Sequence, residues 1–383
     1  QIQPSGVTQF ASGHRHVVIV KSDGSAYAMG QNTSGALGNA NNVDQTSPAQ
    51  IFPSGVKSVA AGAFFTLLLK NDGSLHVTGS NGNGQLGTGD TSNRNSPFQI
   101  ISSGVTGIAG GTNHSLLLKS DGSVFATGQN NYGQLGTGGT NNFISPTQIF
   151  SSGVIQVASG ANHSLFLKTD GSLWATGRNQ RGQLGTGDTV DRNSSTQIVS
   201  SGVIQVASGS EHSVFLKSDG SLHVMGSNMY GQLGTGDNLD RNSSVQILSS
   251  GVVQIAAGAS HTLFLKADGS LWTFGWNSNG QLGVDDTVNR SAPTMVFPSG
   301  VTRLSEVTDD FRHFPTDLNS TAPLAFSENQ PIGTVVGEFN ATDPDANATL
   351  QYSLVDGNES NDNHLFTLDN SGSLRSAVIF DYE

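Results

Sequence analysis

A unit of 49 residues recurs six times between residue 6 and about residue 300, and this fixed period constrains the fold more than any single motif. An Asp-Gly pair keeps the same step, as does a Gly-Gln-Leu-Gly box that reads Gly-Ala-Leu-Gly at Gly35. Each copy also carries a histidine three positions after a glycine, except that Phe65 stands there in the second copy; the histidines are His16, His114, His163, His212 and His261. Each unit can bury its apolar side only against its neighbours, so we expect a stack or a closed ring.

Residues 153–201 represent the unit. Residues 154–158 are rich in β-branched side chains and predict a buried strand, and residues 163–168 predict a second strand. Asp170-Gly171 predicts a type I′ hairpin turn, after which residues 173–176 form a third strand and residues 196–198 an outer fourth one. Because no part of the array keeps a helical period, the pattern predicts a four-stranded propeller blade.

Composition excludes several classes of function. The chain has no cysteine, which excludes disulfides, thiol catalysis and cysteine-ligated metals. Residues 1–300 carry 14 Lys/Arg and 15 Asp/Glu, whereas residues 301–383 carry 3 and 14. The near-neutral array offers no basic stripe, so we expect no nucleic-acid partner and no direct membrane contact, and the acidic end predicts a separate module. No nucleophile–base set or phosphate-binding loop is visible, so an enzyme is not expected.

The run from Ser152 to Asp188, S-G-V-I-Q-V-A-S-G-A-N-H-S-L-F-L-K-T-D-G-S-L-W-A-T-G-R-N-Q-R-G-Q-L-G-T-G-D, resembles the repeat of the regulator of chromosome condensation family. The resemblance implies an all-β fold, a β-propeller of the seven-bladed type, over residues 1–314. Six complete four-stranded repeats are present, and a seventh is only a stub at Gly300-Val301. Either a missing blade lies upstream of Gln1, which we favour, or the ring closes with six.

After a linker at residues 315–322, residues 323–383 resemble a cadherin-like β-sandwich that is truncated at its C-terminal end. The resemblance rests on Ser327-Glu328-Asn329, Ala341-Thr342-Asp343-Pro344-Asp345 and Phe380-Asp381-Tyr382-Glu383. It implies weak calcium binding, because calcium takes clustered oxygen ligands. The ligands it implies are Glu328, Asp381 and Glu383 at one end of the module, and Asp343, Asp345, Asp317 and Asn319 at the other. No cofactor is expected in the propeller.

We interpret the repeated polar residues as structural residues and not as a metal or ligand site. Phe65 replaces a histidine, which a packed strand position tolerates and a metal site does not. An Asp and an Arg four residues apart occur together in four copies and are lost together in the first and third, which predicts a loop-stabilising pair. These pairs are Asp90/Arg94, Asp188/Arg192, Asp237/Arg241 and Asp286/Arg290, and the copies without them carry Asn41/Gln45 and Gly139/Phe143.

Positions that the repeat does not hold constant are better candidates for recognition, because equivalent loops of a ring emerge on one face. The positions before the Gly-Gln-Leu-Gly box and before the histidine vary most, and Tyr and Arg are enriched at interface hot spots. The candidates for partner binding are Tyr132, Arg181, Tyr230, Arg15, Phe64 and Glu211. The alternative, that these positions vary because nothing constrains them, stays open.

We therefore expect a non-enzymatic adhesion module of a larger secreted or cell-surface protein, of bacterial origin, whose signal and anchor lie outside this chain. The propeller would display a protein- or glycan-binding face, and cadherin-like repeats would form a calcium-dependent stalk. Asn-x-Ser/Thr triplets, such as the one at Asn32, fit an extracellular surface. The alternatives are a guanine-nucleotide exchange factor for a small GTPase, which is the activity best known for the propeller family, and a secreted protein inhibitor of an enzyme.

Overall fold

The computed structural model describes residues 6–304, 319–320, 335–340, 366–368 and 373–376. All regular elements in these ranges are β-strands, and none of the ranges holds a helix that could cross a membrane. The chain divides into two compact units, Gln1–Asp309 and Asp310–Glu383, which are described separately.

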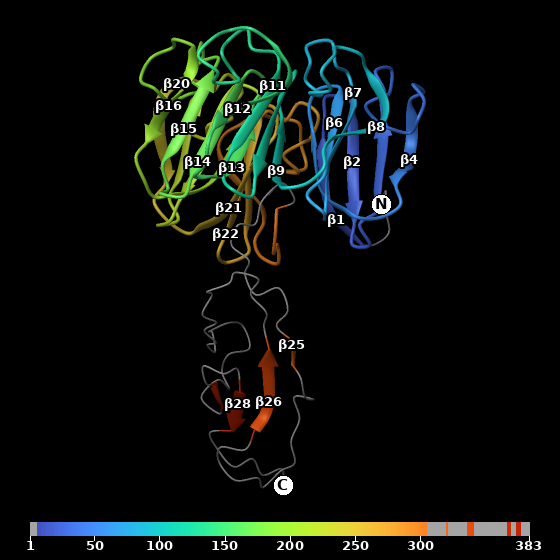
Figure 1. Cartoon of the computed structure of the whole chain (residues 1–383). Coiled ribbons are helices and arrows are strands. Elements are labelled where there is room, and N and C mark those ends of the chain that lie inside the picture. The colour runs from blue at the N-terminus through green and yellow to red at the C-terminus, as the bar shows by residue number, and fades with distance from the viewer. Residues whose placement is uncertain (1–5, 305–318, 321–334, 341–365, 369–372, 377–383) are drawn as a thin grey trace. The chain divides into compact units, whose positions relative to one another are not determined.

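The first unit consists of six four-stranded antiparallel sheets, here called blades 1 to 6, with the strands of each blade hydrogen-bonded in chain order (Figure 1). Blade 1 contains β1 (Val7–Ser12), β2 (His16–Lys21), β3 (Ala26–Gly30) and β4 (Gln45–Phe52). Blade 2 contains β5 (Val56–Ala61), β6 (Phe65–Lys70), β7 (Leu75–Gly79) and β8 (Arg94–Ile101). Blade 3 contains β9 (Val105–Gly110), β10 (His114–Lys119), β11 (Val124–Gly128) and β12 (Phe143–Phe150).

Blade 4 contains β13 (Val154–Ser159), β14 (His163–Lys168), β15 (Leu173–Gly177) and β16 (Arg192–Val199). Blade 5 contains β17 (Val203–Ser208), β18 (His212–Lys217), β19 (Leu222–Gly226) and β20 (Arg241–Leu248). Blade 6 contains β21 (Val252–Ala257), β22 (His261–Lys266), β23 (Leu271–Gly275) and β24 (Arg290–Phe297). These sheets confirm the predicted propeller of four-stranded blades.

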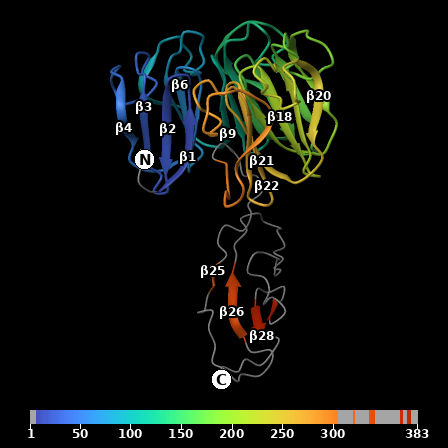
Figure 2. The same cartoon turned by 180° about the vertical axis from the view of Figure 1, so that it is seen from behind.

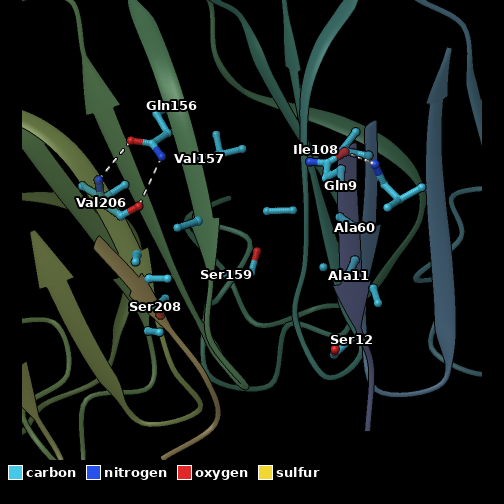
Figure 3. A pocket seen from close by; sticks show the side chains of 18 of the residues that line it. Gln9, Ala11, Ser12, Ala60, Ile108, Gln156, Val157, Ser159, Val206 and Ser208 are labelled. Atoms are coloured by element: carbon cyan, nitrogen blue, oxygen red, sulfur yellow. Dashed lines mark hydrogen bonds between the residues drawn. The ribbon is translucent and has the colours of Figure 1, made fainter. Parts of the chain in front are cut away.

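The first strands of all six blades surround one central cavity of about 120 Å³, so the blades form a ring and not a straight rod (Figure 3). Small side chains let the strands converge there, because an alanine lines the cavity at the same repeat position in every blade: Ala11, Ala60, Ala109, Ala158, Ala207 and Ala256. Seen from behind, blade 6 lies between blades 1 and 5 (Figure 2).

Glutamine side chains tie neighbouring first strands together. The Gln156 amide donates to the carbonyl of Val206 over 3.2 Å and accepts from its N–H over 3.0 Å (Figure 3). Gln205 makes the same pair of bonds to Ile255, at 3.1 and 3.0 Å. The first strands have no direct ladder between blades, so these amides satisfy backbone groups that would otherwise be buried without partners.

The hydrophobic core lies between blades. Leu67 and Leu69 of blade 2 pack in one cluster with Val105 and Ile108 of blade 3, and each of these side chains is at most 3% exposed. Similar clusters join the later blades. Each blade therefore depends on the next one for burial, as the repeat pattern predicts.

Among the described residues, a hydrophobic cluster joins every neighbouring pair of blades except blades 6 and 1. Val7 and Phe10 of β1 are 43% and 39% exposed, whereas their repeat counterparts Val56 and Val59 are 3% and 1% exposed. Beyond β24, Leu304 packs on blade 6 and its N–H donates to the Gln254 side chain over 2.5 Å, which repeats the bond pattern of the earlier first strands. The residues after β24 thus begin a seventh repeat, and part of the apolar face of blade 1 is exposed. The seven-bladed expectation stays a prediction.

The predicted type I′ turn is wrong. In the hairpin between β14 and β15, Gly171 has φ of 73°, and Asp170 is not among the residues with positive φ. Gly171 N–H donates to the carbonyl of Lys168, and Lys168 N–H donates to that of Ser172. This is a three-residue loop, a type I turn followed by glycine in the left-handed region. Asp170 instead accepts a bond from Ser172 N–H over 2.9 Å, which closes the turn.

The second unit is described at four short strands: β25 (Asn319–Ser320), β26 (Val335–Asn340), β27 (Phe366–Leu368) and β28 (Ser373–Ser376). They form one sheet in the order β25-β26-β28-β27.

Candidate functional site: the loop face of the propeller

One face of the ring carries two loops from each blade, the loop between its first and second strands and the longer connection between its third and fourth strands. We call it the loop face. Backbone hydrogen bonds link the first loops of all six blades in sequence. They run from His14 N to Ala63 O (3.0 Å), Ala63 N to Thr112 O (3.4 Å), Thr112 N to Ala161 O (3.1 Å), Ala161 N to Ser210 O (3.0 Å) and Ser210 N to Ala259 O (2.9 Å). The face therefore has a continuous backbone frame.

Four of the five repeated histidines lie under this face and bridge neighbouring blades. His114 Nε2 lies 3.0 Å from the hydroxyl oxygen of Ser164 in the next blade, and Ser164 donates its one proton to the carbonyl of Gln134 over 2.7 Å. The histidine Nε2 must then carry the proton that it donates to Ser164. The same pairing joins His16 to Thr66, His163 to Ser213 and His212 to Thr262. This confirms the packed structural interpretation of these residues.

Burial keeps these imidazoles neutral. Desolvation lowers the pKa of His16 and His114 to about 4, and that of His163 and His212 to about 3. The Nδ1 atoms of His114, His163 and His212 are buried and have no hydrogen-bond partner among the described residues. The glycine three positions earlier is required, because a Cβ at Gly160 would lie 2.1 Å from the His163 ring.

A buried asparagine holds the longer connection of each blade. In blade 4, Asn179 accepts a bond from Leu184 N–H over 2.9 Å and donates to Thr186 Oγ1 and to the carbonyl of Asp188, over 2.9 and 3.0 Å. Asn32 is the blade 1 counterpart; it is fully buried and its amide donates to Asn39 over 2.9 Å. The Asn32 triplet is therefore a structural element of the folded protein and not an accessible glycosylation acceptor.

The predicted Asp–Arg pairs are confirmed as ion pairs. Each Arg Nη2 lies 2.6 Å from a carboxylate oxygen of its Asp, in blades 2, 4, 5 and 6. Hydrogen bonding from Arg192 is the largest cause that lowers the pKa of Asp188 to about 2, and Arg241 acts in the same way on Asp237. The same Asp188 carboxylate accepts a bond from Val190 N–H, so the pair shapes the loop.

Two candidate residues, Tyr132 and Glu211, meet in one cluster through Arg178, which was not predicted. The Arg178 guanidinium lies over the ring of Tyr132, with its carbon 5.3 Å from the ring centroid. Arg178 Nη1 also contacts the Glu211 carboxylate at 2.9 Å. Tyr132, Arg178 and Glu211 come from blades 3, 4 and 5, so the cluster exists only because the blades are side by side.

The arc continues across blades 5 and 6. Arg181 pairs with Asp240 of the next blade at 3.2 Å, and Tyr230 contacts Trp276 of the next blade with ring centroids 5.9 Å apart. Tyr230 is 38% exposed and its neighbour Met229 50% exposed. Because Arg178 and Arg181 both face carboxylates, the arc presents aromatic and apolar surface without a large net charge. We call these residues of blades 3 to 6, Tyr132, Arg178, Arg181, Glu211, Met229, Tyr230, Asp240 and Trp276, the recognition arc.

The remaining two candidates lie apart from this arc, on blades 1 and 2. Phe64 is 36% exposed and contacts the His14 ring at 5.6 Å, and Arg15 is exposed. They form a separate, smaller group on the same loops.

Sequence reasoning missed several members of the arc. Arg178 and Trp276 follow the glycine that ends the third strand, a position where other blades carry Gln31, Ser80, Gln129 and Ser227, so its variability was the available signal. It also missed four apolar loop tips that are more than 60% exposed: Val43, Val190, Leu239 and Val288. Nothing in the repeat distinguishes such tips from ordinary loop residues until their exposure is known.

The calcium ligands implied by the cadherin resemblance lie outside the described residues, except for Asn319 in β25, whose side chain is not described. The implied ligands outside the described residues are Glu328, Asp381, Glu383, Asp343, Asp345 and Asp317. Within the described ranges, no group of three or more His, Asp or Glu side chains is placed to hold a metal ion.

Comparison with family models agrees with this architecture. The model of the RCC1-like domain matches residues 1–201, and models of the regulator of chromosome condensation (RCC1) repeat match residues 203–232 and 252–281, and residues 219–265 and 268–309. The cadherin domain model matches residues 323–383.

One curated relative matches a short part of the chain. The protocadherin-like wing polarity protein stan of Drosophila melanogaster is 39% identical over 87 residues, which is 21% of this chain. The chain spans only 2% of the length of that protein. This match and the cadherin domain model suggest an extracellular context.

Solved structures resemble the propeller. Human WBSCR16 is 26% identical with a TM-score of 0.69, over 77% of this chain and 82% of that one. Prp20p of Saccharomyces cerevisiae, studied for binding to Gsp1p and histones, is 22% identical with a TM-score of 0.67, over 76% of each chain. At that identity the second likeness concerns the fold alone. With six blades of the repeat in the structure and a family model covering more than half of the sequence, the chain belongs to the RCC1-like domain family.

Proposed function

We propose that this chain is a non-enzymatic binding module of an extracellular protein, and that the recognition arc on blades 3 to 6 is its protein-binding surface. One observation carries the proposal. The residues that the repeat holds constant are used in hydrogen bonds that build the ring, whereas the residues that vary on the loop face gather into a partly exposed aromatic and Arg-containing arc.

The chemistry of the arc suits a protein partner. Tyr, Trp and Arg are the side chains that most often dominate protein interfaces. Tyr and Trp add large contact area with few rotatable bonds, and all three still form hydrogen bonds. Tyr230 and Trp276 provide apolar surface, and the Arg178 and Arg181 ion pairs hold their side chains in place before a partner arrives. A preorganised surface loses less conformational entropy on binding.

The test compares variants that borrow residues from other blades. Labelled full-length chain is titrated onto intact cells and onto immobilised extracellular-matrix proteins. Tyr132→Asn and Tyr230→Asn install the residue of Asn83 and Asn279, so the loops keep their fold. The control is Thr169→Ala in the exposed hairpin at the opposite end of blade 4, where blade 6 carries Ala267.

We expect saturable binding by the unmodified chain and the control, and about tenfold or more weaker binding by the double variant, the size of the loss of a hot-spot aromatic. Equal binding by all three proteins, or no saturable binding to any surface, would contradict the proposal.

The cadherin-like region is proposed to contribute a calcium-stiffened stalk. The support is its family match and its carboxylates, which are the ligands that calcium prefers. Nucleotide exchange on a small GTPase is not proposed, because the likeness to Prp20p at 22% identity carries the fold alone.

A further inference from the structure

A polar hollow opens on the loop face between blades 1 and 2, away from the recognition arc. It has a volume of about 310 Å³. Blade 1 contributes Ser34 and Asn42, and blade 2 contributes residues 93–98 at the start of β8. This volume lies at the lower end of the range of small-molecule sites.

The hollow exists because one side chain is small. Ser34 occupies the position that is Tyr132, Arg181 or Tyr230 in blades 3, 4 and 5. At the junction of blades 4 and 5, the Arg181 side chain spans the equivalent space and pairs with Asp240. Ser34 is too short to reach blade 2 in this way, so the space stays open.

Blade 2 is the only blade with an aromatic residue at the Phe98 position of the wall. Phe98 is 45% exposed, and the equivalent positions in the other blades carry Ala49, Thr147, Thr196, Val245 and Thr294. The Arg94 guanidinium lies over the Phe98 ring, with its carbon 5.2 Å from the centroid. The junction that Ser34 of blade 1 leaves open thus also has an apolar ring, which blade 2 supplies.

The polar lining is neutral and offers both donors and acceptors. Arg94 is compensated by Asp90 at 2.6 Å, so the hollow has no free cation. The side-chain oxygen Oδ1 of Asn93 accepts from Asn81 N–H, which leaves the side-chain amide hydrogens of Asn93 for other partners. The hydroxyls of Ser34 and Ser96 and the amides of Asn42 and Asn95 complete the lining, and each can donate and accept.

We propose that this hollow binds a neutral saccharide of one or two sugar units. Sugar hydroxyls donate and accept in equal measure and match amides and serine hydroxyls, while the C–H face of a sugar ring packs against an aromatic edge or face. A carboxylate or phosphate ligand would need an uncompensated cation, and the one Arg in the wall is already paired. The site is independent of the protein contact proposed for blades 3 to 6.

The experiment uses the full chain and ligand-observed NMR with calorimetry. The probes are glucose, galactose, mannose, fucose, N-acetylglucosamine and their common disaccharides, with glucuronic acid and N-acetylneuraminic acid as anionic probes. Phe98→Thr installs the residue of blades 3, 4 and 6 and removes the ring. Ser34→Tyr installs the residue of blades 3 and 5 and fills the hollow. Thr169→Ala is the control, and melting temperatures verify the fold of each variant.

We expect at least one neutral probe to bind with a Kd of about 10 mM or tighter, and Phe98→Thr and Ser34→Tyr each to weaken it about tenfold or more. The control and Tyr230→Asn should bind the sugar normally, which separates this site from the recognition arc. Absence of saturable binding by any neutral probe, binding of the anionic probes alone, or binding that survives Phe98→Thr would overturn the proposal. If Ser34→Tyr does not fold, Phe98→Thr alone decides.

Discussion

The buried histidines make the stability of the propeller depend on pH in a window where its carboxylates do not titrate. Their folded pKa lies well below the unfolded value of about 6.5, since burial disfavours the charged imidazole. Below pH 6.5 the unfolded chain therefore binds more protons than the folded one, so stability is complete above pH 6.5 and falls as the pH drops toward the folded pKa.

The size of the effect follows from the difference in bound protons. Between pH 7 and pH 5.5 each unfolded histidine gains most of a proton while its folded counterpart stays neutral, which costs about 1.2 kcal/mol per histidine. The four histidines together cost about 5 kcal/mol, comparable to the whole stability of many domains. The four are His16, His114, His163 and His212. The aspartates, whose unfolded pKa is near 3.8, contribute only at lower pH.

The assay is urea denaturation of the full chain at pH 7.0, 6.5, 6.0 and 5.5. Unfolding of the propeller strands is followed by far-UV circular dichroism. The matched variant is His114→Phe, which copies Phe65 of blade 2. That Phe is fully buried in the equivalent place, and the hydroxyl of Ser115 beside it still donates to the carbonyl of Gln85. The variant should fold, and its pH dependence should be smaller by the share of one histidine, about 1.2 kcal/mol between pH 7 and pH 5.5.

A stability that stays flat from pH 7 to pH 5.5 would refute the reasoning, as would an unchanged slope in His114→Phe. Either result would mean that the imidazoles are charged or solvated in the folded protein.

Three further predictions concern other parts of the molecule. Gln205→Ser, which installs the residue of Ser58, removes two bonds to Ile255 and should lower the free energy of unfolding by about 1–2 kcal/mol in urea. Asp237→Asn alone should lower the melting temperature more than Asp237→Asn combined with Arg241→Gln, the pair that blade 1 carries as Asn41 and Gln45; equal or reversed effects would show that the two side chains are not coupled. Millimolar calcium should release heat on titration into the full chain, and Asp381→Asn should reduce that heat while Asp23→Asn in a propeller hairpin should not; a heat that Asp381→Asn leaves unchanged would exclude the implied site.

Much of the fold could be predicted from the sequence because the repeat constrains it six times over. The strand predicted at residues 163–168 is β14, His163–Lys168, and the predicted third strand ends one residue before β15 ends at Gly177. Phe65 revealed the packed role of the histidine position, and the joint loss of Asp and Arg revealed their pairing. In each case the copies served as natural variants of one another.

Other features could not be predicted, for physical reasons. The Asp-Gly turn was assigned to the wrong type, because the same pair fits a two-residue and a three-residue loop and only backbone hydrogen bonds distinguish them. The contacts of Arg178 with Tyr132 and Glu211 join three blades. They depend on how the loops of neighbouring blades are placed relative to one another, which the sequence of a single repeat does not determine. Asn32 matched a glycosylation triplet, but burial and hydrogen bonding decide whether such a side chain is accessible.

The central claim is that the repeated residues build the ring while the variable residues of blades 3 to 6 bind a partner. Its most direct test is an equilibrium titration of the unmodified chain and the Tyr132→Asn/Tyr230→Asn variant onto the same cell or matrix surface, with melting temperatures measured in parallel. The account predicts unchanged melting and about tenfold or more weaker binding by the variant. Identical binding curves from two equally stable proteins would contradict it.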